Sequence, residues 1–567
     1  MACSKILLGD LPELTYDIIQ YFRDDIPTLR SCILVNRFWC QTAIPLLWKD
    51  PFSIKNPKNF HFIEIYLHKI NEEDKTQLNR CGINNNVFPS KTLFNYSNFI
   101  KCINTRNMCS IIVNWIKINE TFTCSKGRIF LLLIKVFIEN EAKLNTFEIE
   151  IAFNYLMSRK FFNSIFKLIL QNPRFISNIK NLKLHFNEEI IKYKFDYNFL
   201  KCFYYHCNLI SSLHIRFSNY ESFSNNYMTI KNQLSQITNS QKNLQKFIFS
   251  HFPFSENNIR LDNIICGSNS SKHLKIIIFY KIDFKNILHI KEAFEQLNVL
   301  ESIHILECLI FNSSFIQQII GLNKPLKLIS LFIRNEDDHR SLFMSDEDRN
   351  LQIESIRLLF QKFGGYLENI GFNSNVGVLK YRVLELINNY CKRIKFFDIY
   401  TSSIQKAHNI LDSVKIFVQN LNYLSIYFYF PYDEKNESTI ELFLRLTHVL
   451  PCKLEFLNLS FSGKITKNAW EVFLKNLKNI FVKKLLFETS MLVLADILPY
   501  IKEYIMKEKR AEYLAIASIH TNRNRCQCQK ELFNMTDELK EFESYNIKVK
   551  EYYNLFIKAY EFIDEMY

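Results

Sequence analysis

Glycine is scarce in this chain: only 10 of its 567 residues are glycine, and Gly364 and Gly365 are the single adjacent pair. Phosphate-cradling loops and the tight turns of dinucleotide-binding folds need several residues without a Cβ atom. Neither G-x-G-x-x-G nor G-x-x-x-x-G-K-S/T occurs in the sequence. The sequence therefore excludes the common glycine-rich nucleotide-binding sites.

Motifs for catalysis and metal binding are also missing. There is no G-x-S-x-G, no H-E-x-x-H and no paired Cys-x-x-Cys. Cys526 and Cys528, with His520 upstream, offer at most three ligands, whereas a structural zinc site takes four at recognisable spacing. No nucleophile, base and orienting group stand in a recognisable arrangement. We therefore expect no catalytic residue, no metal and no cofactor, and a chain that is not an enzyme.

Long hydrophobic runs are absent as well. The strongly apolar stretch 129–138 contains Lys135 and is far shorter than the roughly 20 residues that span a bilayer. Gly9 and Asp10 interrupt the short apolar start at Ile6, so we expect no secretory signal. The 15 cysteines are scattered and odd in number. These features predict free thiols in a reducing compartment, the cytoplasm and/or the nucleus, and no membrane partner.

Hydrophobic residues make up 48% of the chain, with 52 Phe and 28 Tyr, so a large core can form. The formal net charge is +14. Its lysines and arginines are spread along the chain, often beside acids, without a concentrated basic run. We interpret this charge as solvated helix faces and expect no nucleic-acid partner.

The N-terminal region has the apolar spacing of short helices. One predicted helix face carries Leu11, Leu14, Ile18, Ile19 and Phe22. Asp25 followed by Pro27 predicts a cap and the first turn of a second helix. A third is predicted over 36–43, ending before Pro45. Such a three-helix unit is too small to bury much core alone, so it should pack on the rest of the chain, on a partner or on both.

Residues 8–52 also carry a series of short motifs in a fixed order. These are L-P-E-L from Leu11, D-I-I from Asp17, L-V-N-R-F-W from Leu34 and P-L-L-W from Pro45. In order and spacing they resemble an F-box. The middle, 23–27, is more polar than usual in the family, and Asn36 replaces a more common small residue or Cys. The alternative interpretation is a generic N-terminal helical cap.

The resemblance implies how this unit acts. An F-box docks on a small Skp-type adaptor and, through it, joins a cullin-RING ubiquitin ligase. The positions that match the family imply the following residues in that docking or its immediate support: Leu11, Pro12, Leu14, Ile18, Ile19, Val35, Asn36, Trp39 and Trp48.

A repeated pattern fills most of the remaining chain. The template apolar-x-x-apolar-x-apolar fits thirteen times, from Leu144/Phe147/Ile149 to Ala511/Leu514/Ile516, and one match is Leu326/Ile329/Leu331. Successive matches start 26 to 41 residues apart, with helical patterns between them. This resembles an irregular leucine-rich-repeat solenoid, a horseshoe of short parallel strands with outer helices. The predicted fold class is therefore α/β.

The domains that follow from these patterns are an F-box at 8–52, a helical bridge at 53–143, a solenoid at 144–520 and a C-terminal helical cap at 521–567. The bridge is long enough to contain a degenerate first repeat. Leu532, Leu539 and Phe542, then Tyr552, Leu555, Phe556 and Tyr560, carry the helical pattern of the cap. A terminal repeat needs such a cap to cover its open end.

The residue after each third apolar position should point to the concave face of the sheet. Aromatic side chains are common interface anchors, because they bury much area at a small cost in rotamer entropy. The middle repeats of the solenoid are notably aromatic at these positions, and Asp398 and Tyr423 should lie beside them, although Phe and Tyr are abundant throughout. We predict a target-binding surface at Tyr280, Phe332, Asp398, Tyr400, Tyr423 and Tyr427. The acidic run from Glu336 is a second candidate, for a basic partner, or simply a solvated loop.

An F-box followed by leucine-rich repeats resembles the substrate receptors of SCF-type ubiquitin ligases. The expected partners are the adaptor, the cullin-RING ligase behind it, and a protein target that the sequence does not identify. The alternative is a repeat scaffold that acts without ubiquitin ligation.

Overall fold

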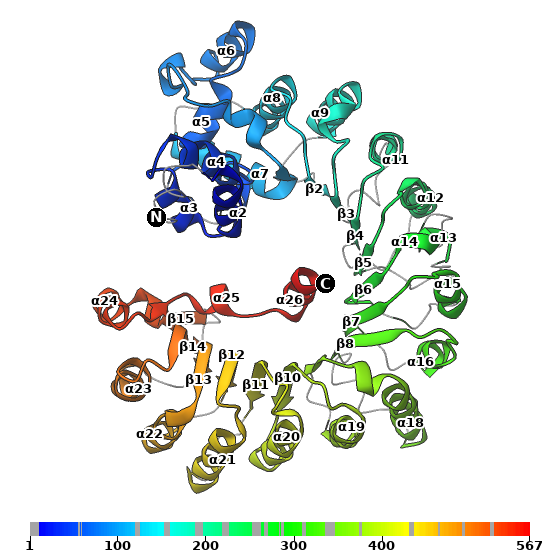
Figure 1. Ribbon diagram of the computed structural model, residues 1–567, viewed down its shortest axis with the longest axis vertical. Helices are drawn as coiled ribbons and strands as arrows, with labels where there is room; N and C mark the ends of the chain where they lie inside the picture. The colour runs from blue at the N-terminus through cyan, green and yellow to red at the C-terminus, as the bar shows by residue number, and fades with distance from the viewer. Residues whose placement is uncertain are drawn as a thin grey trace. The chain divides into compact units, whose positions relative to one another are not determined.

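The chain is an α/β protein built from alternating strands and helices (Figure 1). The structure, a computed structural model, describes the following residues: 11–54, 57, 59–119, 125–151, 159–186, 197–217, 226–251, 262–265, 270–282, 284, 289–308, 313–334, 346–373, 377–429, 436–462, 465–489, 494–521 and 527–567. Residues 8–10 and Cys526 lie outside this set, as does the first part of the acidic run, 336–338; its last part, 346–348, begins α18. The chain forms two compact units, which divide near residue 275.

Unit 1 begins with helices and continues as strand–helix repeats. Strands β1 to β5 pair in sequence order, and every pair is parallel. Its helices are α2 Pro12–Tyr21, α3 Ile26–Cys32, α4 Arg37–Leu47, α5 His61–Leu67, α6 Glu72–Asn79, α7 Thr105–Ile118, α8 Lys126–Glu139, α9 Arg159–Gln171, α11 Lys201–His206, α12 Asn226–Ser240, α13 Asp262–Ile265 and α14 Ser270–His273. Its strands are β1 Cys102–Asn104, β2 Thr146–Ile151, β3 Asn181–Phe186, β4 Ser212–Phe217 and β5 Lys246–Ser250.

Unit 2 continues the same alternation. Its strands are β6 Ile276–Tyr280, β7 Ser302–Cys308, β8 Lys327–Arg334, β9 Asn369–Asn373, β10 Phe396–Thr401, β11 Tyr423–Phe428, β12 Lys453–Phe461, β13 Phe481–Thr489, β14 Ala511–Thr521, β15 Gln527–Glu531 and β16 Lys548–Val549. Its helices are α15 Ile290–Gln296, α16 Ser313–Ile320, α18 Asp346–Phe363, α19 Gly377–Tyr390, α20 Ile404–Phe417, α21 Asn436–Val449, α22 Lys467–Asn476, α23 Leu494–Ile501, α24 Thr536–Ser544, α25 Tyr552–Leu555 and α26 Ala559–Met566. Strands β6 to β14 pair in parallel order, whereas β15 runs antiparallel to β14.

The thirteen predicted strands coincide with β2 to β14, which confirms the repeated strand–helix alternation. Successive side chains of a strand face opposite sides of its sheet. In β3, for example, Leu182 and Leu184 are buried under the helices, whereas Lys183 and His185 lie on the other side. We call that other side, which carries no repeat helices, the open face. The bridge adds β1, which pairs with β2 as a degenerate first repeat would.

Strand β8 departs from the predicted register. Along β7 the pairing passes from Ile303↔Leu328 to His304↔Ser330, so β8 carries one extra residue, Ile329, in a bulge. Beyond it, Leu331 pairs with Ile370 of β9. The third apolar position of one predicted repeat thus lies beside the second position of the next. The template is therefore wrong about the register of β8. The bulge changes which residues pair with the neighbouring strands, but it leaves the apolar spacing of the sequence unchanged, so this spacing does not reveal it.

Gly371 of β9 is required by a close approach. A Cβ atom at this position would lie 2.4 Å from Cδ1 of Phe332, which is buried across the strand. We expect Gly371→Ala to displace the Phe332 ring and to lower the free energy of unfolding by about 1–3 kcal/mol, the usual cost of overpacking. Chemical denaturation measures this. Gly365→Ala is the matched control, because a Cβ atom at Gly365 meets nothing within 4 Å; an equal loss in both variants would contradict the prediction.

Candidate interaction surfaces

The N-terminal unit consists of α2, α3 and α4, which pack against one another (Figure 1). Pro12 lies in the first turn of α2, where its missing N–H is not needed. Asp25 caps α3 by accepting hydrogen bonds from the N–H and hydroxyl of Thr28, at 3.1 and 2.6 Å. Asn36 caps α4 by accepting one from the N–H of Trp39 at 2.9 Å. Local side chains therefore define where these helices begin.

The predicted end of the third helix is wrong. Helix α4 runs through Pro45 to Leu47, and the N–H of Trp48 still donates to the carbonyl of Ile44 at 3.1 Å. A proline removes one main-chain donor and restricts the residue before it, which is why the sequence predicts an end there. Near the C-terminal end of a packed helix, burial of Ala43 and Ile44 outweighs that loss.

Four of the nine predicted docking residues have structural roles within the chain. Ile19 and Trp39 lie in the buried core of the three-helix unit, and Ile18 packs against that core. Asn36 acts as the helix cap described above. Substitutions here would unfold the unit rather than report on a docking surface.

Three others present apolar side chains to solvent. Leu11 is 39% exposed, and Leu14 and Val35 are each 45% exposed. Leu34, which the family pattern includes but the predicted docking residues omit, is 83% exposed, and Tyr21 is also exposed. Leu11, Leu14 and Tyr21 lie on or beside α2, and Leu34 and Val35 lie between α3 and α4, so all five are accessible to a partner of this unit. We call these five residues the apolar surface of α2–α4.

Trp48 faces the chain that follows the three helices. Its ring lies 5.4 Å from that of Tyr66 and 4.1 Å from that of Tyr96. Tyr66 in turn contacts the rings of Phe52 and Phe137, at 6.3 and 5.0 Å. This aromatic cluster packs the end of α4 against α5 and α8, so Trp48 supports the three-helix unit from behind.

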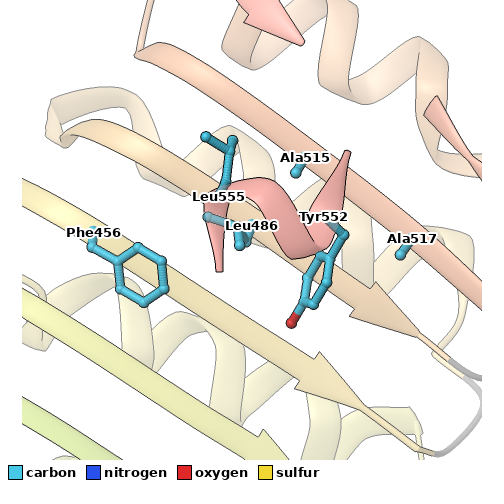
Figure 2. Close-up of a cluster of buried hydrophobic side chains, with 6 residues drawn as sticks. All are labelled: Phe456, Leu486, Ala515, Ala517, Tyr552 and Leu555. Atoms are coloured by element: carbon cyan, nitrogen blue, oxygen red, sulfur yellow. The ribbon is translucent and has the colours of Figure 1, made fainter. Parts of the chain in front are cut away.

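The C-terminal segment 551–567, which includes α25 and α26, lies on the open face of unit 2 (Figure 1). We call it the tail segment. Tyr552 and Leu555 of α25 cover strands β12 to β14 in a buried cluster (Figure 2), whose other members are Phe456, Leu486, Ala515 and Ala517. The predicted helical pattern of 521–567 falls largely on α24, α25 and α26. The sequence did not predict strands β15 and β16, which pair with β14, nor that α25 lies across the sheet.

Two of the predicted target-binding residues contact this segment. The ring of Tyr280 stacks on that of Tyr560 at 4.4 Å. Tyr423 lies 4.7 Å from Phe562, which also meets Phe396 edge-on at 5.2 Å. The predicted aromatic surface therefore already carries aromatic side chains of the same chain.

The four remaining predicted residues also lie on the open face, on β8, β10 and β11. Phe332 is buried against Phe396, 5.4 Å between ring centres. Tyr400 stacks loosely on the exposed Tyr429 at 6.3 Å. Burial, with the charge of Asp398 nearby, raises the pKa of Tyr427 well above its usual value. Asp398, Tyr400 and Tyr427 thus lie on one stretch of the open face.

Buried polar groups run along the open face beneath the tail segment. The amide of Asn458 donates to the hydroxyl of Ser425 at 2.9 Å and accepts a hydrogen bond from the hydroxyl of Tyr552 at 2.7 Å. Further along, the amide of Asn369 donates to Ser330 at 2.9 Å. Sequence reasoning missed these residues, because the repeat template classifies them only as non-apolar positions.

Near the end of the tail segment, Tyr567 contacts the same face. Its ring lies 4.5 Å from that of His304, and its hydroxyl donates to Glu368 at 3.3 Å. Burial and the nearby carboxylate raise the pKa of Tyr567 to about 12. The sequence shows a helical pattern from Tyr552 to Tyr560, but this pattern does not reveal which surface of the chain the segment contacts.

The open face of unit 1 is charged instead of aromatic. His185 lies between two carboxylates, 3.7 Å from Glu148 and 3.8 Å from Glu150, and Arg106 contacts Glu150 at 2.9 Å. Burial tends to raise the pKa of Glu150, but the contacts with His185 and Arg106 outweigh it and lower that pKa. Arg106 of α7 thus compensates the charge of Glu150 at the edge of this group.

Next to this group, His214 is buried with Nε2 2.7 Å from the hydroxyl oxygen of Ser250. Burial holds the pKa of His214 well below its usual value, and several neighbouring basic groups reinforce this: His185, Lys183, Arg216 and Lys246. The folded chain keeps this imidazole neutral. The unfolded chain binds a proton there below about pH 6.5.

We therefore expect acid to weaken unit 1 through His214. Each pH unit below about 6.5 should lower the free energy of unfolding by up to about 1.4 kcal/mol, because the unfolded state takes up the proton first. Denaturation at pH 7.5 and 5.5 should show a smaller loss for His214→Gln than for the unsubstituted chain. His61→Gln, at an exposed histidine, is the control. Equal losses in all three proteins would contradict the assignment.

Four thiols of the described residues are deeply buried and protonated at neutral pH. Burial raises the pKa of Cys109, Cys207, Cys308 and Cys391 to about 12 each. Thiols with such values are poor nucleophiles at neutral pH. In the described part of the chain, no group of three or more His, Cys, Asp or Glu side chains is arranged to hold a metal ion.

Neither a comparison with models of known protein families nor a search of curated proteins finds a match for this chain. Among the residues that the structure describes, no helix combines the length and the apolar character needed to cross a membrane. Two surfaces remain as evidence of function, namely the apolar surface of α2–α4 and the open face of unit 2.

Proposed function

We propose that this chain is the substrate receptor of an SCF-type ubiquitin ligase, with α2–α4 as an F-box that binds a Skp-type adaptor. The observation that carries the proposal is the apolar surface of α2–α4. Its five residues belong to a small unit that has its own buried core around Ile19 and Trp39, and they are not part of that core. Exposed apolar side chains that a core does not need are best explained by a partner.

The repeats supply the second half of the role. In this proposal they are leucine-rich repeats, and the open face of unit 2 binds the protein target. The chain performs no chemistry itself: it raises the effective concentration of the target at a ubiquitin-loaded enzyme, and the rate gain comes from proximity and orientation. Such a receptor works in the cytoplasm or nucleus.

Binding between the purified chain and a purified Skp-type adaptor tests the proposal. We expect a stable complex that co-elutes in size-exclusion chromatography and that recruits a cullin. A failure to bind the adaptor at micromolar concentrations would overturn the F-box assignment. The chain would then be a repeat scaffold that acts without ubiquitin ligation, and a steep salt dependence of nucleic-acid binding would identify a charged ligand.

A further inference from the structure

The tail segment 551–567 contacts the open face of unit 2 mainly through side chains. Strand β16 still pairs with β14, and Lys550 donates its N–H to the carbonyl of Leu514 at 3.0 Å. From there on, the backbone–backbone hydrogen bonds of the segment close turns within it, such as from Phe556 to Tyr552 and from Tyr567 to Ile563. The N–H of Tyr552 also donates to the carboxylate of Glu531 at 3.1 Å. A peptide docked in a groove makes contacts of this kind.

Aromatic anchors spread these contacts over many strands. Tyr552 lies on β12 to β14, Phe562 lies on β10 and β11, and Tyr560 stacks on the end of β6. Tyr567 reaches His304 of β7. A few buried aromatic side chains carry most of the free energy in peptide and protein interfaces.

The sheet beneath differs from the core on its other side. The inward row of β12 to β14, with Leu457, Leu485 and Leu514, is apolar and buried under helices. The open face combines the polar Asn458 and Ser425, which can bond to water if the tail segment leaves, with the apolar Phe456 and Leu486, which α25 covers. Loss of the tail segment would therefore expose a mixed polar and apolar surface that a partner can cover again, while the inward core stays under its helices.

We propose that the tail segment is an intramolecular ligand of the target-binding face, displaced by a protein segment that carries aromatic side chains on a short helical turn. The proposal deepens the target-binding half of the function proposed above and rests on it for the role of that face. Because the tail segment is tethered, its effective concentration at the face is in the millimolar range for a short flexible link. A partner segment must bind the face tightly enough to displace the tail segment at this effective concentration, so segments of low affinity do not bind.

The full chain can be cut beside the tail segment after folding. Lys550 and Glu551 are exposed, so a site-specific protease sequence inserted between them should be accessible. A fluorescent synthetic peptide with the sequence of residues 551–567 is then added to the cleaved protein, and its binding is followed by anisotropy. We expect the labelled peptide to replace the cleaved segment reversibly.

Two peptide variants test the anchors. Tyr560→Ala combined with Phe562→Ala should weaken binding at least about tenfold, as loss of interface anchors does. Tyr553→Ala is the matched control, because Tyr553 is 61% exposed, and it should bind within about twofold of the unsubstituted peptide. In the uncut chain, the double substitution should open the face, so that the labelled peptide binds at least tenfold more tightly than to the uncut Tyr553→Ala chain.

Three results would overturn the proposal. One is a cleaved chain that aggregates or loses its cooperative unfolding when the segment departs, which would make the segment an integral part of the fold. Another is equal binding of the double-variant peptide and the Tyr553→Ala peptide, and the third is failed exchange of the labelled peptide. Adaptor binding is measured on the same samples. Failure of the uncut chain to bind the adaptor refutes the F-box assignment only. Failed peptide exchange in a chain that still binds the adaptor refutes the role of the tail segment as a ligand.

Discussion

Replacing Leu14 and Val35 together by aspartate should abolish binding of this chain to a Skp-type adaptor. Each side chain is 45% exposed, so the substitutions leave the core of α2–α4 intact. In the proposed complex both would be buried, and two unpaired carboxylates would then be desolvated at several kcal/mol each. We expect at least about a hundredfold loss of affinity by isothermal calorimetry or biolayer interferometry, at an unchanged thermal midpoint.

Leu93→Asp is the matched control. Leu93 is 91% exposed and lies outside the three helices, so its substitution should leave adaptor affinity within about twofold. If the double variant bound the adaptor as tightly as the unsubstituted chain, the apolar surface of α2–α4 would serve another partner.

The second large effect is expected from Phe52→Ala. The Phe52 side chain is buried between α5 and α8, with the rings of Phe62, Tyr66 and Phe137 at 5.5, 6.3 and 6.4 Å. Removing it leaves a cavity that the surrounding rings fill only in part. We expect the free energy of unfolding of unit 1 to fall by about 3–5 kcal/mol. Chemical denaturation followed by tryptophan fluorescence should detect this, because Trp48 joins the same cluster through Tyr66.

Phe481→Ala removes the same side chain from an exposed position and should cost less than about 1 kcal/mol. Similar losses in the two variants would contradict the view that this aromatic cluster joins the three-helix unit to the repeats. The functional consequence can be checked separately: Phe52→Ala should retain adaptor affinity at low temperature, because the apolar surface of α2–α4 is unchanged.

The strands of this protein were predictable from the sequence because their determinants are local. An apolar-x-x-apolar-x-apolar run places two alternating side chains under a helix, whatever the rest of the chain does. The thirteen runs coincide with strands β2 to β14, and in β8 a bulge shifts the register. The helix starts at Asp25 and Asn36 are local in the same sense, because a cap side chain bonds within its own turn.

The features that were missed depend on neighbours in space. The bulge at Ile329 is a property of two paired strands, and no spacing within one strand encodes it. The run of α4 through Pro45 depends on what the end of that helix buries. Trp48 matches a docking pattern by sequence, yet its partners Tyr66 and Tyr96 are distant in the chain.

The sequence by itself determined the repeated strand–helix alternation and the helix starts of the N-terminal unit. It also excluded the common glycine-rich nucleotide-binding motifs. Only the tertiary structure decided that α2–α4 leave Leu14 and Val35 exposed, and that Tyr280 and Tyr423 meet Tyr560 and Phe562. The physical reason is that alternation and capping are set within a few residues. The exposure of Leu14 and Val35 instead depends on how three separate helices pack. The aromatic contacts join segments more than a hundred residues apart, so their pairing is a result of folding.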